Sequence, residues 1–288
     1  MQIKILGAGG FTGGHLIEHL NSLGHDIFPI YRNQDLNLIA ESRWQQSYTS
    51  NSSKLRVVIN LAGTWRNANR QEIIQANYEY PREMLKKEIM LGGALVWIQA
   101  SSYYQIYKDI YGIDKDLYSA QKQLFSEYLM HESINNNDFV VLDIVLPYLT
   151  GPKEPKERIF SKLALTKIND KLIELTSGSS ILPILDVRDF SNLVAHRIRM
   201  LEQNLDLHSE TIYPNVSSVL SLRSHIENSL KDITHLCNFG ALADRRNEFT
   251  SISEVTKIYK VNKHLRSLSL SFNDQVNFLL SEISKDSQ

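Results

Sequence analysis

The chain has 288 residues, of which 42% are hydrophobic and 22% charged, so it is long enough to bury an extensive core as one large domain or as two lobes. Its 31 basic and 32 acidic residues nearly cancel, which excludes the global positive field that attracts nucleic acid or a membrane surface. The single Cys237 excludes an internal disulfide and a cysteine-rich metal site, and no apolar run approaches the roughly 20 residues of a membrane span. Because no leader segment follows Met1, we expect a cytoplasmic protein without membrane insertion and without a nucleic-acid partner.

The chain opens with a short apolar strand, residues 3–6, that runs directly into a glycine-rich turn. Gly7 permits the tight turn, Gly10 removes a Cβ that would obstruct a phosphate, and Gly13 lets the next helix pack close to the sheet. That helix is expected to start near Phe11, and the free N–H groups of a helix start favour an anion. A turn that merely needs glycine would lack this strand and helix context. The pattern therefore predicts that a dinucleotide diphosphate is bound by Gly7, Gly10, Phe11 and Gly13.

Short apolar runs alternate with helical patterns through the first half of the chain. Strands are predicted at residues 3–6, 27–31, 57–60, 94–99 and 139–145, and helices at residues 14–23, 70–91 and 115–132. Continuous Val, Ile and Leu runs separated by helices are typical of a parallel sheet covered on both faces. We therefore expect an α/β fold with a doubly wound, Rossmann-type parallel sheet. Pro29 lies inside the second strand, so this strand should be short or bulged, and residues 34–54 are not assigned.

The pattern changes after Pro147, where a charged loop with Gly151 and Pro152 leads into shorter, less regular elements. We expect a dinucleotide-binding domain over residues 1–150 and a smaller, mainly substrate-binding lobe over residues 151–288, with some elements returning to the sheet. In open α/β sheets the substrate binds at the carboxyl ends of the strands, where such a lobe would define specificity.

Tyr118 and Lys122 lie four residues apart in a predicted helix, so both side chains share one face and the ammonium can lower the pKa of the phenol. Among 13 tyrosines chance alone gives about one such pair. Position favours Tyr118, because it opens a long helix after the strand at residues 94–99, whose end carries Ser101 and Ser102. The same spacing also occurs at Tyr104/Lys108, Tyr111/Lys115 and Tyr259/Lys263.

Together these motifs resemble the extended short-chain dehydrogenase/reductases, specifically their nucleotide-sugar epimerases, dehydratases and reductases. The resemblance covers nearly the whole chain. It includes the glycine-rich turn, residues 60–63, Asn77, the two serines, the Tyr118/Lys122 pair, the loop at Pro147 and residues 186–189. Residues 239–248 are similar to a stretch of abequose and paratose synthases, which reduce a 4-keto-3,6-dideoxy sugar on cytidine diphosphate.

The resemblance implies catalytic roles for three residues. Tyr118 would be the general acid that protonates the 4-keto oxygen. Lys122 would lower the pKa of Tyr118 and bind the cofactor ribose. Ser102 would be the second donor to that oxygen, with Ser101 in reserve, because Ser102-Tyr103-Tyr104 is similar to the Ser-Phe-Phe that ends this strand in abequose synthase-like sequences.

The resemblance also implies contacts to ligands. Tyr103 and Arg245 would contact the substrate, Arg245 at its diphosphate, although Arg245 with Arg246 also fits an ordinary solvated pair. Besides the glycine-rich turn, Tyr118 and Lys122, the cofactor would meet Leu61, Ala62, Gly63, Asn77 and Pro147.

The cofactor is expected to be NADPH, with NAD as the alternative. Arg32 follows the second strand, where an enzyme that uses NAD usually carries an acidic residue for the ribose hydroxyls, so Arg32 should meet the 2′-phosphate. Two family features are missing: an Asp after the third strand that contacts adenine, which residues 34–54 do not supply, and an Arg-Asp-Phe segment, where residues 180–183 stand instead.

Three functions are weighed. The first is NADPH-dependent reduction of a 4-keto nucleotide sugar for a bacterial surface polysaccharide of the O-antigen type. The second is a nucleotide-sugar 4-epimerase that holds NAD tightly, and the third is a protein that senses NAD(P) without catalysis. The expected partners are a nucleotide-diphosphate sugar and a second copy in a homodimer.

No metal is expected, because His15 and His19 lack a third ligand nearby. Cys237 is expected to be an inert core residue.

Overall fold

The computed structural model describes residues 1–32, 37–49, 55–64, 68–106, 116–203, 208–245 and 248–286. The chain forms two compact units, Met1–Leu146 with Ser191–Tyr213 and Pro147–Phe190 with Pro214–Gln288. The first unit thus includes a segment from the second half of the sequence. The expected functional division, cofactor over residues 1–150 and substrate over 151–288, stays a prediction.

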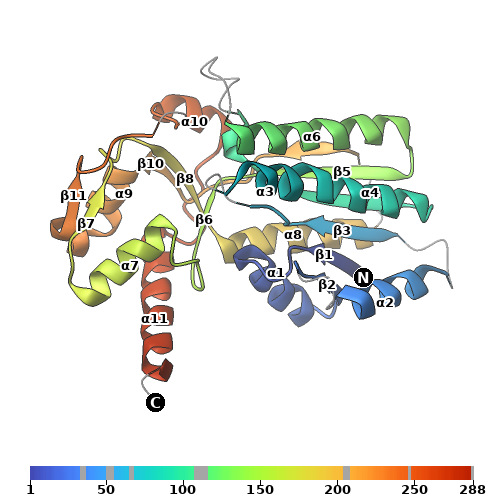
Figure 1. Ribbon diagram of the computed structural model, residues 1–288, viewed down its shortest axis with the longest axis horizontal. Coiled ribbons are helices and arrows are strands. Elements are labelled where there is room, and N and C mark those ends of the chain that lie inside the picture. Colours follow the sequence, from blue (N-terminus) through green and yellow to red (C-terminus); the bar gives the residue numbers. More distant parts are fainter. Residues whose placement is uncertain are drawn as a thin grey trace. The chain divides into compact units, whose positions relative to one another are not determined.

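Unit 1 contains a six-stranded parallel sheet in the order β2-β1-β3-β4-β5-β9. This order confirms the expected Rossmann-type α/β fold, because the chain reverses direction across the sheet between β1 and β3. Figure 1 shows α3, α4 and α6 on one face and α1 and α8 on the other. The strands are β1 (Gln2–Leu6), β2 (Asp26–Ile30), β3 (Arg56–Asn60), β4 (Leu95–Ser102), β5 (Phe139–Leu146) and β9 (Glu210–Ile212). The helices are α1 (Phe11–Ser22), α2 (Asn37–Thr49), α3 (Arg70–Ile74), α4 (Tyr80–Met90), α6 (Leu117–Asn135) and α8 (Val187–Glu202), with a π-helical turn η2 (Gln75–Glu79) and a 3₁₀ turn η3 (Tyr103–Ile106).

The predicted strands and helices agree with the structure within a few residues, with two differences. The predicted helix over residues 70–91 is interrupted between α3 and α4 by the π turn η2, which contains Asn77. The strand predicted over residues 94–99 continues to Ser102, so the two serines belong to β4 itself. Side chains cap the starts of α3 and α6. The Asn69 side chain accepts the N–H of Glu72 at 2.9 Å before α3, and the Asp116 carboxylate accepts the N–H of Ser119 at 2.8 Å before α6.

The edge of the sheet explains why residues 34–54 carry no strand signal. The described part of this segment contains α2, and the following strand, β3, pairs directly with β1. No described strand precedes β3 there to carry the adenine-contacting Asp. Pro29 pairs in register with Ile5, and β2 is a five-residue edge strand, short as predicted and without a bulge. Proline is tolerated at an edge because an N–H that points outward has no ladder partner to lose.

A buried ionic cluster, formed by Lys4, Glu41, Arg56 and Glu88, links the sheet to α2 and α4. Lys4 Nζ lies 2.6 Å from Glu88 Oε1 and 2.7 Å from Glu41 Oε2, and Arg56 Nη1 lies 3.1 Å from Glu88 Oε2. Trp44 donates its indole N–H to Glu88 Oε2 at 3.2 Å. Lys4, Arg56 and Glu88 are almost fully buried, so the opposite charges compensate one another inside the unit.

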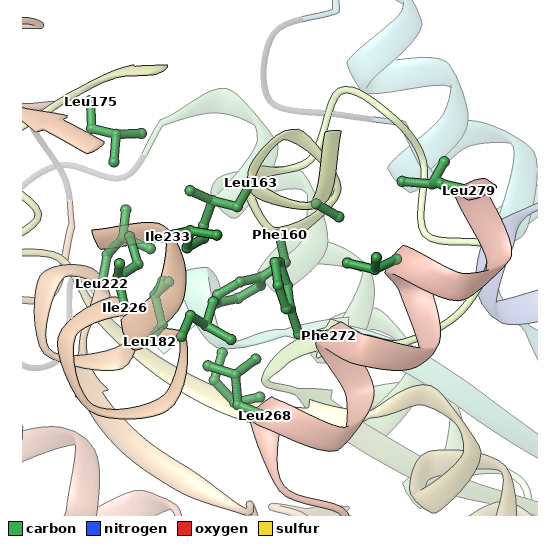
Figure 2. Close-up of a cluster of buried hydrophobic side chains, with 14 residues drawn as sticks. Phe160, Leu163, Leu175, Leu182, Leu222, Ile226, Ile233, Leu268, Phe272 and Leu279 are labelled. Carbon is green, nitrogen blue, oxygen red and sulfur yellow. The ribbon is translucent and has the colours of Figure 1, made fainter. Parts of the chain in front are cut away.

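Unit 2 has a three-stranded sheet, β10-β8-β6, and a parallel pair, β11 with β7. Its apolar core brings together Phe160 of α7, Ile226 of α9 and Phe272 of α11 (Figure 2). None of the helices in the described ranges is both long and apolar enough to cross a membrane. The elements are β6 (Tyr148–Thr150), α7 (Ile159–Asn169), β7 (Ile173–Leu175), β8 (Ile181–Asp186), β10 (Ser218–Ser221), α9 (Leu222–Ser229), η4 (Lys231–Leu236), β11 (Cys237–Phe239), α10 (Ile252–Ile258) and α11 (Leu268–Asp286).

Candidate active site

The glycine-rich turn after β1 packs against the turn after β3. Gly7 has a φ of +79°, and a Cβ there would lie 2.7 Å from the backbone nitrogen of Ala62. A Cβ at Gly13 would lie 2.5 Å from the Gly7 carbonyl oxygen. A Cβ at Gly10 would meet only that same oxygen, at 3.4 Å, so Gly10 keeps the space before α1 open. Backbone approach therefore requires Gly7 and Gly13, whereas Gly10 leaves room for a group at the helix start, where Phe11 is the first residue.

The turn after β3 is held by a buried amide pair. Asn60 Oδ1 accepts the Ala62 N–H at 3.1 Å, and Asn60 Nδ2 donates to Gln99 Oε1 at 2.8 Å. Leu61 donates its N–H to the Leu6 carbonyl at 3.0 Å. These bonds fix Leu61, Ala62 and Gly63 at the carboxyl end of the sheet, beside the glycine-rich turn.

Gly63, Asn77 and Lys122 converge from three different elements. A Cβ at Gly63 would lie 3.0 Å from Asn77 Oδ1 and 3.3 Å from Lys122 Nζ, so glycine lets both side chains approach the backbone. Asn77 is 1% exposed and donates to the Ile73 carbonyl at 2.9 Å, while its buried Oδ1 has no hydrogen-bond partner among the residues that the structure describes. A π turn often marks a functional site, and here it carries Asn77.

Lys122 is buried at the ends of β3 and β4. Its Nζ donates to the Ala100 carbonyl at 3.1 Å and to the Ala62 carbonyl at 3.4 Å. Burial lowers the pKa of Lys122 to about 8, and the charge of Asp143 acts in the opposite direction. A lysine with this pKa changes charge near neutral pH and can take part in proton transfer.

Tyr118 lies on the same face of α6 as Lys122 and is half-buried. Asp116 caps this helix two residues before Tyr118, so the start of α6 and the position of Tyr118 are fixed together. Of the alternative pairs, Tyr104 lies in η3, while Tyr259 is buried in unit 2 just after α10 ends. The remaining alternatives, Lys108, Tyr111 and Lys115, fall outside the described residues.

The two serines at the end of β4 face different partners. Ser101 Oγ shares a 2.8 Å hydrogen bond with Ser126 Oγ in the interior. Ser102 Oγ accepts the Tyr104 N–H at 3.4 Å, and the Ser102 N–H donates to Gln105 Oε1 at 3.3 Å. Both serines are buried, and the choice of Ser102 over Ser101 stays a prediction.

Two other predicted residues of unit 1 have contrasting exposure. Tyr103 is buried, with its ring centroid 4.2 Å from that of Tyr104. Arg32 follows β2 and is exposed. The preceding Tyr31 lies beside the glycine-rich turn, because a Cβ at Gly9 would be 3.3 Å from Tyr31 Cδ1.

Pro147 and Arg245 belong to unit 2. Pro147 is buried between β5 and β6, and Arg245 is 61% exposed, with Nη1 at 3.9 Å from Glu248 Oε1. The segment before Arg245 is ordered by backbone bonds from Gly240 to Thr176 and from Leu242 to Leu175. Arg246 lies outside the described residues. The predicted substrate role of Arg245 and cofactor role of Pro147 stay predictions.

No three His, Cys, Asp or Glu side chains of the described residues gather into a group that could hold a metal ion. Cys237 is half-buried in β11, and burial raises the pKa of its thiol. A thiol with a raised pKa is a poor nucleophile at neutral pH.

Sequence reasoning missed several polar residues that support the site. The Asn37 side chain of α2 forms hydrogen bonds with both the N–H and the carbonyl of Tyr31. Gln99 of β4 accepts a hydrogen bond from Asn60. Asp143 lies in the middle of the apolar strand β5 and is 1% exposed. A charged residue inside a Val, Ile and Leu run is the one signal that could have identified Asp143, because a buried carboxylate needs partners.

Comparison with known proteins gives a family match and similar folds. A model described as "NAD dependent epimerase/dehydratase family" matches residues 3–212. No curated protein matches the sequence. Among solved structures, MoeE5 in complex with UDP-glucose and NAD has 15% identity and a TM-score of 0.72, with 98% of this chain and 100% of that chain covered.

Two further structures have comparable similarity. UDP-glucuronic acid 4-epimerase from Bacillus cereus, in complex with UDP-glucuronic acid and NAD, has 18% identity, coverages of 98% and 100%, and a TM-score of 0.69. The NAD-dependent NDP-hexosamine 5,6-dehydratase TunA has 15% identity, coverages of 97% and 98%, and a TM-score of 0.70. At these identities the similarity establishes the fold alone.

Proposed function

This chain belongs to the NAD-dependent epimerase/dehydratase family, and from that premise we propose that it is an NAD(P)-dependent oxidoreductase acting on a nucleotide-diphosphate sugar. We assign it specifically as a reductase of a 4-keto sugar nucleotide. The observation that carries the proposal is the convergence of Gly63, Asn77 and the buried Lys122 at the carboxyl ends of the strands. Fold alone could not support this, since one fold hosts many activities.

The glycine-rich turn fits a dinucleotide. An open position at Gly10, in front of α1, is where a diphosphate would be bound by backbone N–H groups. Leu61, Ala62, Gly63, Asn77 and Lys122 would border the rest of the cofactor. Asn77 Oδ1 is buried and has no partner within the described ranges, so it can accept a hydrogen bond there. The MoeE5 and 4-epimerase structures named above contain NAD; for this chain we propose NADPH, because the exposed Arg32 can pair with a 2′-phosphate.

The chain's own residues supply proton transfer and charge stabilisation. Tyr118 would donate its phenolic proton to the 4-keto oxygen, while the Lys122 ammonium on the same helix face favours the phenolate left behind. Ser102 would donate a second hydrogen bond to that oxygen as negative charge develops on it. When bound, the reduced nicotinamide supplies the hydride.

Dehydration is disfavoured by the residues after β4. A dehydratase of this family carries an Asp-Glu pair directly after the strand-end Ser or Thr, which removes one proton and protonates the leaving hydroxyl. Here Tyr103 and Tyr104 occupy those positions, and tyrosine does neither readily at neutral pH.

Epimerisation is the second candidate, because it uses the same Ser, Tyr and Lys. The similar fold of a UDP-glucuronic acid 4-epimerase with NAD supports it. We prefer the reductase because Arg32 favours NADPH and residues 239–248 resemble a stretch of abequose and paratose synthases, and both features favour a cofactor that exchanges in each cycle. The proposal includes a role in the synthesis of a surface polysaccharide of the O-antigen type, a cytoplasmic location and a homodimer. A non-catalytic NAD(P) sensor would have no need of Tyr118 and Lys122 together.

Stoichiometry distinguishes these functions. The protein should be incubated with NADPH and a panel of 4-keto-6-deoxy sugar nucleotides, with absorbance of the reduced nicotinamide recorded. A reductase oxidises one NADPH for each sugar nucleotide consumed. Sugar inversion by protein that carries bound NAD, with no external NADPH consumed, would establish the epimerase instead. Binding without turnover of any sugar nucleotide would support the sensor.

A further inference from the structure

A buried polar network, formed by Asp143, Ser126, Ser101 and Gln105, lies behind the proposed active site. Ser126 Oγ donates to Asp143 Oδ2 at 2.6 Å and shares the 2.8 Å bond with Ser101 Oγ. Gln105 Nε2 donates to Ser126 Oγ at 3.4 Å. Each of these four side chains is at most 7% exposed. The network therefore joins β5, α6, β4 and η3 without involving solvent.

This network reaches both elements that carry the proposed catalytic side chains. Ser126 follows Lys122 by one helical turn on the same face of α6. On the other side, Gln105 Oε1 accepts the N–H of Ser102 at the end of β4. Hydrogen bonds that meet at Ser126 thus connect the helix of Lys122 with the end of β4 that carries Ser102.

The negative charge of Asp143 also stabilises the ammonium form of Lys122. In the part of the chain that the structure describes, its carboxylate is the charged group that raises the pKa of Lys122 against the lowering caused by burial. Burial raises the pKa of Asp143 itself, whereas the hydroxyls of Ser101 and Ser126 and the charge of Lys122 lower it. The groups facing this pair from β4 and α6 are neutral hydroxyls, so the two charges depend on each other.

We propose that Asp143 is a positioning residue of the active site, which orients α6 and the end of β4 through Ser126 and keeps Lys122 in its ammonium form. The inference rests on the proposed function for its catalytic meaning, but its physical content concerns the protein alone. The described hydrogen-bond partners of the buried Lys122 Nζ are the neutral carbonyls of Ala62 and Ala100, so without the negative charge of Asp143 the ammonium would lose its proton more readily.

The test compares Asp143→Asn, which keeps shape but removes charge, with Asp138→Asn, an exposed aspartate just before β5. Lysine labelled with ¹³C at Cε allows Lys122 to be titrated by NMR, and the spectrum of Lys122→Gln assigns its resonance. In Asp143→Asn the pKa of Lys122 should fall by about one unit or more, and in Asp138→Asn it should not change. An unchanged Lys122 pKa in folded Asp143→Asn would overturn the proposal.

A second measurement needs no substitution at Asp143. In the unsubstituted protein labelled at aspartate Cγ, the Asp143 resonance should report an ionised carboxylate at neutral pH. A protonated Asp143 there would overturn the proposal even if Asp143→Asn failed to fold. Turnover separates this from the proposed function: if the Lys122 pKa falls as expected while Tyr118→Phe keeps full activity, the electrostatic pair stands and the catalytic assignment fails.

Discussion

The Asn37 side chain pairs with the backbone of Tyr31 as a neighbouring strand would. Its Oδ1 accepts the Tyr31 N–H at 2.8 Å, and its Nδ2 donates to the Tyr31 carbonyl at 2.9 Å. At the edge of the sheet, where no described strand lies beyond β2, this amide satisfies both polar groups of the residue next to Arg32. Asn37 therefore fixes the backbone from which Arg32 extends.

We expect Arg32→Ala to weaken NADPH binding by about tenfold or more while leaving NADH binding nearly unchanged, because only NADPH carries the 2′-phosphate. Titration of each reduced cofactor by fluorescence measures both dissociation constants. Arg43→Ala, which removes another exposed arginine of unit 1, serves as the control. Asn37→Ala should reproduce part of the loss, because the Tyr31 backbone next to Arg32 would lose both hydrogen bonds to the Asn37 side chain. Equal affinities for NADPH and NADH in the unsubstituted protein would contradict the assignment of Arg32.

Tyr118→Phe should lower the turnover rate by about 10² to 10⁴, the range for loss of a general acid, and leave cofactor affinity nearly intact. The phenyl ring preserves packing in α6 and removes only the hydroxyl. Steady-state kinetics with NADPH and the best 4-keto sugar nucleotide gives the rate. Tyr104→Phe is the matched control, and a loss confined to that variant would mean that the wrong tyrosine has been assigned.

The pH dependence of kcat/KM should show activity falling as pH rises through about 8, where the buried Lys122 loses its proton. The sign follows from the mechanism, because only the ammonium form favours the phenolate of Tyr118. Below this pH Lys122 is charged and its contribution is complete. A profile that stays flat or rises well above pH 8 would exclude the ammonium as the required form.

Arg245→Ala should raise the KM for the sugar nucleotide by about tenfold with little change in the KM for NADPH, because the guanidinium is proposed to bind the substrate diphosphate. Lys231→Ala removes another exposed cation of unit 2 and should change neither constant. A larger effect on the KM for NADPH than on that for the sugar nucleotide would assign Arg245 to the cofactor instead.

Glu88→Gln should lower the free energy of unfolding by about 3 kcal/mol, since it leaves Lys4 and Arg56 buried with one fewer negative charge. The described tryptophans, Trp44 and Trp97, lie in unit 1, so urea unfolding followed by tryptophan fluorescence reports this unit. Glu83→Gln, at an exposed position of α4, should have little effect. If both variants unfold at the same urea concentration, the ionic cluster contributes no net stability.

The sequence by itself determined the local elements and the family. Strand-sized apolar runs, glycines at fixed spacing and the Tyr118/Lys122 pair depend on neighbours within a few residues, so they can be read along the chain. The doubly wound order follows as well, because parallel strands joined by helices have few topologies.

Only the tertiary structure decided which distant side chains share one environment. Gly63, Asn77 and Lys122 meet because the turn after β3, the π turn η2 and the first turns of α6 lie together, and no spacing in the sequence encodes that meeting. The helix α2, the π turn at Asn77 and the network around Asp143 depend on contacts over long separations, such as that between Ser126 and β5. Burial and charge compensation act through space, so the chemistry of Lys122 is set by residues that its own helix does not contain.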